Sequence, residues 1–231
     1  MTKKVDFYNF PIELLQGVFS GKQSEVEFLL NILKFHIFKK YLELPDSEFE
    51  QTEEQRFSRC AQMWGFLIPR ELLEEFFNDA ESLYYSLDHS KVKTGISIAT
   101  FKEYFNNSKT EFEWNCLIAF LALKSILLFG KSRKSTNDML FARMNGFATI
   151  NEYVENGRCE LKRFRRQRVI TELETNWNLK YYAMQTHGFY FGFEISLEQL
   201  MIIAETKKDE NKKRILDEKK KKILEQIRKP P

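Results

Sequence analysis

We take five short motifs along the 231-residue chain as helix starts, each a Ser or Thr followed three residues later by Glu or Gln. In such a capping box the two side chains bond the free N–H groups at the start of a helix, so each motif predicts a helix start. The pairs are Ser24/Glu27, Ser47/Glu50, Thr110/Glu113, Thr149/Glu152 and Ser196/Gln199. With several helix starts of this kind, the chain is predicted to be mainly α with small β-hairpins.

The apolar spacing between these motifs places the remaining elements. In the first half we expect a helix from Ser24 that ends near Leu44, before Pro45, and a domain linker at 106–108. The other elements expected there are helices at 55–65 and 70–87 and a strand at 92–98. The second half is expected to hold helices at 112–129, 136–145 and 161–176, a turn at 149–156, aromatic strands at 179–184 and 189–195 around a His-Gly tip, and a helix from Leu197.

The order helix, helix, turn, helix and hairpin in the second half is that of a winged helix, and its residues resemble that family too. Residues 136–146 are similar to the first helix and turn of a helix-turn-helix, in the pattern Thr136-x-x-x-Leu140-x-Ala142-x-x-x-Gly146. Residues 166–179 look like the end of a recognition helix entering a wing, in the pattern Arg166-x-x-Val169-Ile170-x-x-Leu173-Glu174-x-x-Trp177-x-Leu179. About 14 residues follow Gly146 before the basic helix, where the family has a turn of about 3–4 residues. The resemblance spans residues 110–200 and implies DNA binding.

A weak internal repeat extends this resemblance to the first half. Residues 61–66 match residues 142–147 at four of six positions, so the first half is either a diverged winged helix or similar by chance. The helix expected at 70–87 is acidic and would be repelled by phosphates, so that half is expected to bind protein. Its acids are Glu71, Glu74, Glu75, Asp79 and Glu81. Two winged helices, one for association and one for DNA, resemble the architecture of plasmid and phage replication initiators.

The charge of the chain is unevenly divided. Residues 1–100 hold 11 basic and 16 acidic residues, whereas residues 101–231 hold 25 basic and 17 acidic residues. The excess is concentrated at 124–168, with 11 basic and 4 acidic residues. Such asymmetry favours a polyanionic partner for the second half. The alternative is a solvated helix whose arginines pair with Glu160, Glu172 and Glu174.

The basic helix provides the candidate DNA-binding residues. At 100° per residue, Arg165 and Arg168 are expected opposite its apolar edge of Val169, Ile170 and Leu173, facing base edges in a major groove. The other residues expected to contact bases or phosphates are Lys131, Arg133, Lys134, Arg143, Lys162, Arg163, Arg166, Thr171, Thr175, Lys180 and, at the wing tip, His187.

Two further segments are ambiguous. The alternating Phe189, Phe191 and Phe193 are typical of core packing, and an RNA-stacking sheet is disfavoured because its usual motif is missing. Residues 205–231 hold 11 basic and 6 acidic residues, with Leu216, Ile223 and Ile227 near helical spacing. This segment is interpreted as a helix covering the core, a mobile arm that binds DNA, or a solvated helix.

Enzymatic, metal and membrane signals are missing from the sequence. The histidines are isolated, and Cys60, Cys116 and Cys159 lack metal-ligand spacing and fit a reducing compartment. The most apolar run, 117–129, is too short and too polar to span a bilayer. No catalytic residue, cofactor, metal or membrane partner is expected, and the chain is expected to be cytoplasmic.

The sequence therefore predicts three segments: an association domain at 1–105, a winged-helix domain at 106–204 and a charged helix or tail at 205–231. The function expected is double-stranded DNA binding in replication initiation or transcription control. A homodimer or protein partner is expected through 1–105, where apolar residues such as Phe76, Phe77, Leu83 and Tyr84 exceed one small core. The alternative is a helical interaction protein, an adaptor or inhibitor, with no nucleic-acid partner.

Overall fold

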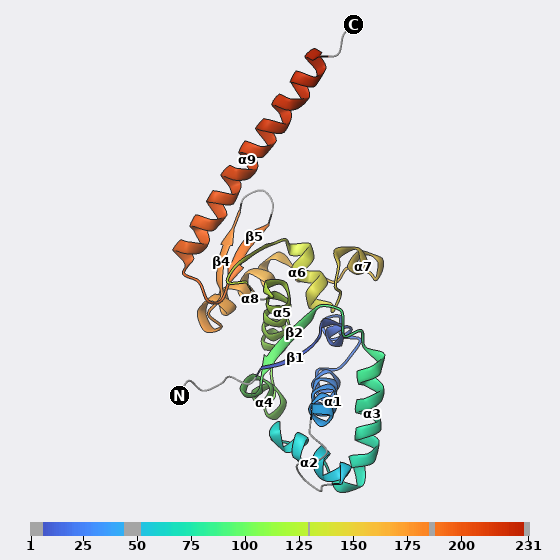
Figure 1. Ribbon diagram of the computed structural model, residues 1–231. Coiled ribbons are helices and arrows are strands. Elements are labelled where there is room, and N and C mark those ends of the chain that lie inside the picture. Colours follow the sequence, from blue (N-terminus) through green and yellow to red (C-terminus); the bar gives the residue numbers. More distant parts are fainter. Residues whose placement is uncertain (1–6, 44–51, 129, 185–187, 229–231) are drawn as a thin grey trace, which may run out of the picture.

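The computed structural model describes residues 7–43, 52–128, 130–184 and 188–228. Over these residues the chain is mainly α-helical, with one two-stranded and one three-stranded antiparallel sheet (Figure 1). The predicted fold class is therefore confirmed. The capping box predicted at Ser47/Glu50, the helix end at Leu44 and Pro45, and His187 lie outside the described residues.

The N-terminal half contains a long helix that packs with three shorter α-helices and a small sheet. Its elements are β1 (Phe7–Pro11), the 3-10 helix η1 (Ile12–Leu15), α1 (Glu25–Glu43), α2 (Glu53–Met63), the 3-10 helix η2 (Arg70–Leu72), α3 (Leu73–Ser86), β2 (Lys93–Ser97) and α4 (Ile98–Asn106). Strand β2 pairs antiparallel with β1, with Phe7 opposite Ser97. The strand after α3 thus pairs with one that precedes α1, and the described residues of this half contain no hairpin after α3.

The C-terminal half has the predicted order of main helices and hairpin, with a short helix at the expected turn and one strand that was not predicted. Its elements are α5 (Glu111–Leu127), β3 (Arg133–Ser135), α6 (Asn137–Met144), α7 (Ile150–Glu155), α8 (Arg163–Asn176), β4 (Lys180–Ala183), β5 (Phe189–Gly192) and α9 (Leu197–Arg228). Strands β4 and β5 form the predicted hairpin, and β3 joins the other edge of β5. The predicted capping boxes at Thr110 and Thr149 are formed.

The segment between Gly146 and α8 is a folded insertion. Its helix α7 is followed by an irregular stretch at 157–162. In this stretch, the carbonyl oxygen of Cys159 accepts hydrogen bonds from the side chains of Asn145 (2.9 Å) and Tyr153 (3.1 Å). Gly146 has a φ of +80°, and a Cβ there would lie 2.6 Å from the backbone nitrogen of Gln16. Glycine is therefore required at this turn both by its backbone conformation and by the close approach of the N-terminal half.

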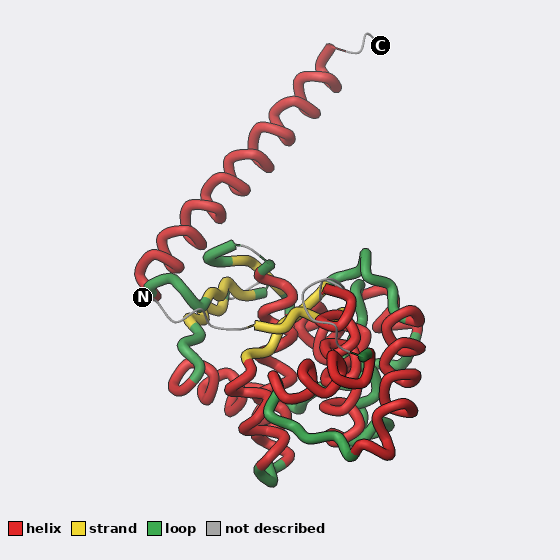
Figure 2. Tube along the Cα trace, turned by 60° about the horizontal axis from the view of Figure 1, so that its bottom comes forward, coloured by secondary structure: helices red, strands yellow, loops and turns green. Residues whose placement is uncertain are grey.

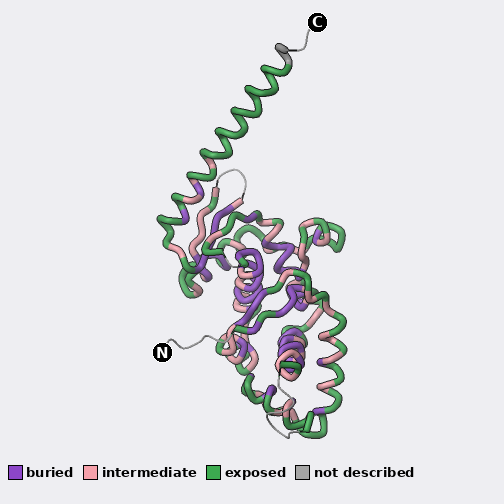
Figure 3. The backbone as a smooth tube through the Cα atoms, in the orientation of Figure 1, coloured by how far each residue is buried: buried purple, intermediate pink, exposed green. Residues whose placement is uncertain are grey.

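A single hydrophobic core extends across the predicted domain boundary. Helix α5 lies at its centre, with twelve of its seventeen residues buried (Figure 3). The core joins Phe10 and Phe28 from the first half to Leu173 and Phe191 from the second. The buried hydroxyl of Thr94 in β2 also donates a hydrogen bond of 2.6 Å to the carbonyl oxygen of Leu121 in α5. The two halves are therefore packed as one body.

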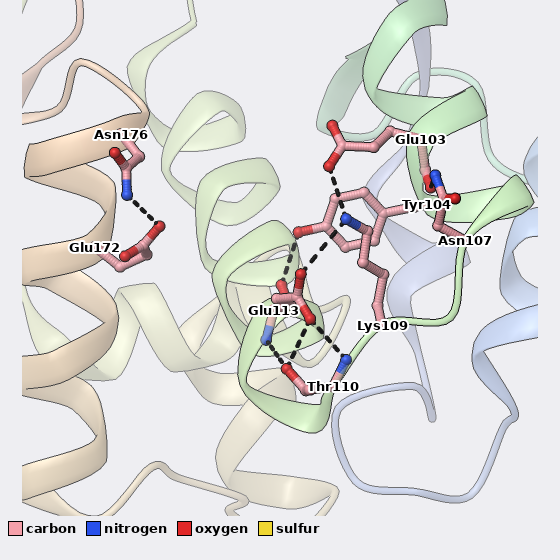
Figure 4. Close-up of polar contacts among 8 residues, drawn as sticks. All are labelled: Glu103, Tyr104, Asn107, Lys109, Thr110, Glu113, Glu172 and Asn176. Carbon is pink, nitrogen blue, oxygen red and sulfur yellow. Dashed lines mark hydrogen bonds and ion pairs between the residues drawn. The ribbon is translucent and has the colours of Figure 1, made fainter.

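The predicted linker at 106–108 is a tight joint between α4 and α5 (Figure 4). The Tyr104 hydroxyl donates to the Glu113 carbonyl oxygen at 2.9 Å, and its ring lies 5.1 Å from that of Trp114. The Lys109 ammonium bridges the carboxylates of Glu103 and Glu113 at 2.7 and 3.4 Å. These contacts fix the angle between the helices, so the segment does not separate two independent bodies.

The apolar residues that suggested a surplus in the first half are partly buried against the core of the chain. The rings of Phe38 and Phe77 lie 5.5 Å apart, and that of Tyr84 lies 5.4 Å from the ring of Phe35. Such edge-to-face and offset-stacked pairs stabilise a core beyond the area that they bury. These side chains are explained by packing within the chain, and they give no argument for a partner.

Helix α9 leaves the body of the molecule. Figures 1 and 2 show its C-terminal part extending away from every other element. Its described side chains are all exposed from Asp209 to Glu225. Among the helices that the structure describes, none is both long enough and apolar enough to cross a membrane.

A buried aromatic box encloses His36 in α1. The ring of Tyr8 lies 3.5 Å from the imidazole, that of Trp64 lies 4.6 Å away, and His36 is only 4% exposed. Burial, followed by the charges of Lys40 and Lys39, lowers the pKa of His36 from 6.5 to about 2. The imidazole is therefore neutral in the folded protein.

We expect the two halves to unfold in one transition, because they share a core. Trp64 reports on the first half, and Trp114 and Trp177 report on the second. In a Trp64→Phe variant, and separately in a Trp114→Phe/Trp177→Phe variant, the fluorescence midpoint in denaturant should coincide with the midpoint from circular dichroism. Two distinct midpoints within either variant would show that the halves unfold independently.

Acid should destabilise the protein through His36. Below pH 6.5 the unfolded chain takes up a proton at this position and the folded chain does not, so stability is lost as the pH falls. Between pH 6.5 and 5 this loss is about 2 kcal/mol. We expect a His36→Phe variant, which keeps a ring in the box, to lose less of its free energy of unfolding over this interval. Equal losses in the two proteins would contradict the prediction.

Candidate nucleic-acid interface

Helix α8 is fixed on α5 by one apolar edge. Val169, Ile170 and Leu173 are buried, as the sequence predicted. At the end of the helix, the ring of Trp177 lies 4.8 Å from that of Phe120 in α5. This anchoring leaves the opposite side of α8 in solvent and holds it rigidly relative to the core.

The outer side of α8 carries polar and basic side chains. The exposed residues on it are Phe164, Gln167, Arg168, Thr171 and Thr175. The Thr175 hydroxyl donates to the backbone carbonyl oxygen of Thr171 at 2.8 Å, so this hydroxyl lies along the helix surface. The guanidinium of Arg168 lies 4.9 Å from the ring centre of Phe112 in α5, which orients the side chain while leaving it exposed.

Arg165 does not share this outer side with Arg168. Its guanidinium forms an ion pair of 2.6 Å with Glu111, at the first turn of α5. Both partners are exposed, and an exposed pair contributes at most about 1 kcal/mol. The sequence placed Arg165 opposite the apolar edge of α8, whereas the structure places it on the flank that faces α5.

The remaining cations of α8 surround its N-terminus. Lys162 and Arg163 are exposed, whereas Arg166 is half-buried. Arg166 lies close enough to Tyr181 in β4 for its charge to offset part of the rise that burial causes in the pKa of that hydroxyl. Arg166 therefore lies on the side of α8 that faces β4, away from the exposed outer residues.

The start of α8 lacks the features that usually stabilise the N-terminus of a helix. Its N-cap residue, Lys162, makes no side-chain capping bond, and its first turn has no acidic residue. Each of the other α-helices in the described ranges has a side-chain cap or an acid in its first turn. Cations at this end oppose the helix dipole. A local rule broken in this way is typical of a functional surface.

The cations of the sheet lie on two different faces. Directly paired residues of neighbouring strands point to the same side. Arg133 pairs with Phe191, which faces the main core, whereas Lys134 pairs with Tyr190, which faces α9. Lys180 in β4 pairs two residues beyond Tyr190 and shares its face. Lys131, Arg133 and Lys134 are exposed and Lys180 is half-buried, so the first three are accessible to a phosphate.

Arg143 does not belong to this surface. It is 8% exposed within α6, and its Nε and Nη1 atoms have no hydrogen-bond partner among the described residues. Burial lowers the pKa of this guanidinium, and the negative charge of Glu152 offsets part of the effect. The predicted contact between Arg143 and a DNA backbone is corrected, because the side chain points into the protein.

The aromatic hairpin is covered on both faces. Phe189 and Phe191 belong to the main core, and Tyr190 packs with Leu200 and Ala204 of α9. The predicted core packing is confirmed, and no ring of β5 is free to stack on a base. The first turns of α9 thus cover the sheet through residues that precede position 205. The described side chains from Asp209 to Glu225 are all exposed, so for the segment from 205 onward the structure agrees with the solvated-helix interpretation.

A cavity of about 530 Å³ opens between α4, α5 and α8. Its carboxylates are engaged: Lys109 bridges Glu103 and Glu113, and the Asn176 amide donates to Glu172 at 2.7 Å (Figure 4). Hydrogen bonds from Thr110 lower the pKa of Glu113, so this group stays ionised and is unsuited to act as a general acid. Within the part of the chain that the structure describes, no three His, Cys, Asp or Glu side chains could hold a metal ion together.

Sequence reasoning missed two residues of the outer side, Phe164 and Gln167. The same 100° rotation that separates Arg168 from the apolar edge places Phe164 in one row with Thr171 and Thr175, and would have identified it.

The sequence matches no protein-family model, and no curated protein or solved structure matches the chain.

Replacing Lys162 by Ser should stabilise the protein. The serine oxygen can accept a bond from the uncapped N–H groups of α8, which is worth about 1 kcal/mol relative to alanine. Lys162→Ala is the matched control, because it removes the same charge without supplying an acceptor. Equal free energies of unfolding for the two variants, measured in denaturant, would contradict the capping argument.

Proposed function

We propose that this chain is a sequence-specific double-stranded DNA-binding protein acting in replication initiation or transcription control. The observation that carries the proposal is the outer side of α8, where exposed Arg168, Gln167 and Thr171 stand on a rigidly anchored helix. Such side chains bond base edges in the major groove, which is wide enough to admit an α-helix. The order of elements in the C-terminal half, with a hairpin after this helix, also supports the interpretation of this half as a winged helix.

The cations that lie away from the outer side of α8 are suited to contact the phosphate backbone of DNA. Lys162 and Arg163 stand at the N-terminus of α8, where the helix dipole also favours an anion. The weak surface pair of Arg165 with Glu111 can be exchanged for a phosphate at little cost. Lys131, Arg133 and Lys134 add exposed cations beyond the far end of α5, about 24 Å from its start, with Arg133 and Lys134 on opposite faces of the sheet. Cations near both ends of α5 would contact the DNA backbone on either side of the base contacts.

The acidic first half is expected to face away from the duplex. Glu71 in η2 and Glu74 and Glu75 at the start of α3 are exposed, and phosphates would repel them. Association of residues 1–105 with a second copy or another protein remains part of the proposal. It rests on this charge, since the apolar residues that first suggested it are packed in the core.

Arg168 provides the sharpest test. In the full-length protein, Arg168→Ala should weaken binding to a duplex selected from random DNA by about 1–3 kcal/mol. Arg168→Lys keeps the charge but lacks the planar fork that pairs with guanine, so it should lose the same sequence preference with an unchanged salt dependence. Kd would be measured by fluorescence anisotropy over a range of salt concentrations, on the selected duplex and on an unrelated one.

Arg70→Ala is the matched control, because Arg70 is an exposed arginine in the acidic half and its loss should change neither affinity nor preference. Arg165→Ala should instead weaken binding to the selected and the unrelated duplex equally, as expected for the loss of a phosphate contact. A helical interaction protein without a nucleic-acid partner would bind neither duplex at low salt. That result would refute the proposed function.

A further inference from the structure

Phe164 is the most unusual residue of the proposed recognition surface. It lies on the first turn of α8 with 74% of its surface exposed. Residues seven and eleven positions apart return to the same side of a helix, so Phe164 begins the row that continues with Thr171 and Thr175. This row is opposite the buried edge of Val169 and Leu173. The ring contributes nothing to the core, and phenylalanine forms helices less readily than alanine.

We propose that Phe164 reads a thymine through its C5-methyl group in the major groove, an inference that rests on the proposed DNA binding by α8. Thymine presents an apolar methyl group in this groove, and phenylalanine is among the side chains that pack on it. Its flanking residues suit the neighbouring bases. Gln167 matches the adenine edge and Arg168 matches the guanine edge, both as bidentate partners.

The spacing along α8 defines the expected site. From Phe164 to Gln167 the helix rises about 4.5 Å, which is little more than the step of about 3.4 Å between base pairs. The thymine and the adenine are therefore one or two base pairs apart, with the guanine of Arg168 next to the adenine. The recognised half-site thus combines A·T pairs with a guanine within about three base pairs.

Uracil tests this contact directly, because it differs from thymine only by the methyl group. After a duplex has been selected with the full-length protein, each thymine is replaced in turn by uracil and Kd is measured at one salt concentration. At one position, the replacement of thymine by uracil should weaken binding of the wild-type protein about fourfold, which is the value expected for one buried methyl group. Phe164→Ala should bind the unmodified duplex about fourfold more weakly and should not respond to uracil at that position.

The control variant is Tyr85→Ala, which removes an exposed aromatic ring in α3 of the acidic half. It should keep the wild-type response to uracil. The inference is wrong if no uracil position weakens binding, or if Phe164→Ala keeps the wild-type response. It is also wrong if selection yields no preferred sequence, or if Phe164→Ala alters sedimentation and not DNA affinity, since the ring would then contact protein. If the wild-type chain binds no DNA at all, the proposed function itself is refuted.

Discussion

The burial of α5 is the constraint on which the rest of the structure depends. A helix that is apolar on nearly all sides must be surrounded, and here the surrounding elements come from both halves of the chain. Strand β2 is joined to it by the buried bond between Thr94 and Leu121, and α8 packs on its other side. The acidic half is therefore part of the scaffold that positions the basic half. The acidic and basic surfaces of the molecule are held at a fixed distance from each other.

The same helix sets the geometry of the candidate interface. Its first turn provides Glu111 and Phe112, which contact Arg165 and Arg168. These two contacts differ in consequence. The ion pair directs Arg165 along the flank of α8, while the contact with the ring leaves Arg168 exposed on the outer side. Two arginines three residues apart are thereby given different tasks, one suited to a phosphate and one suited to a base.

The start of α8 carries cations where helix stability favours acids. The chain caps its other helices with Ser or Thr, or places acids in their first turns, yet it surrounds this one terminus with Lys162, Arg163 and Arg165. The helix persists because three buried side chains anchor it to the core. An exposed Phe164 on the same turn belongs to this pattern, since neither the cations nor the ring helps the isolated chain to fold.

The sequence by itself determined most of the helices and the hairpin, because capping boxes and apolar spacing act over a few residues. It also located the apolar edge of α8 and the basic segment beside it. It did not predict α4, or the strands β1 and β3, whose pairing partners are distant in the sequence. Only the tertiary structure decided that Arg143 is buried, that Arg165 turns toward Glu111, and that the run 106–108 is a tight joint. Each of these depends on residues distant in the sequence, or on two helices that meet at an angle. No local pattern encodes which surface the fold will bring against a given side chain.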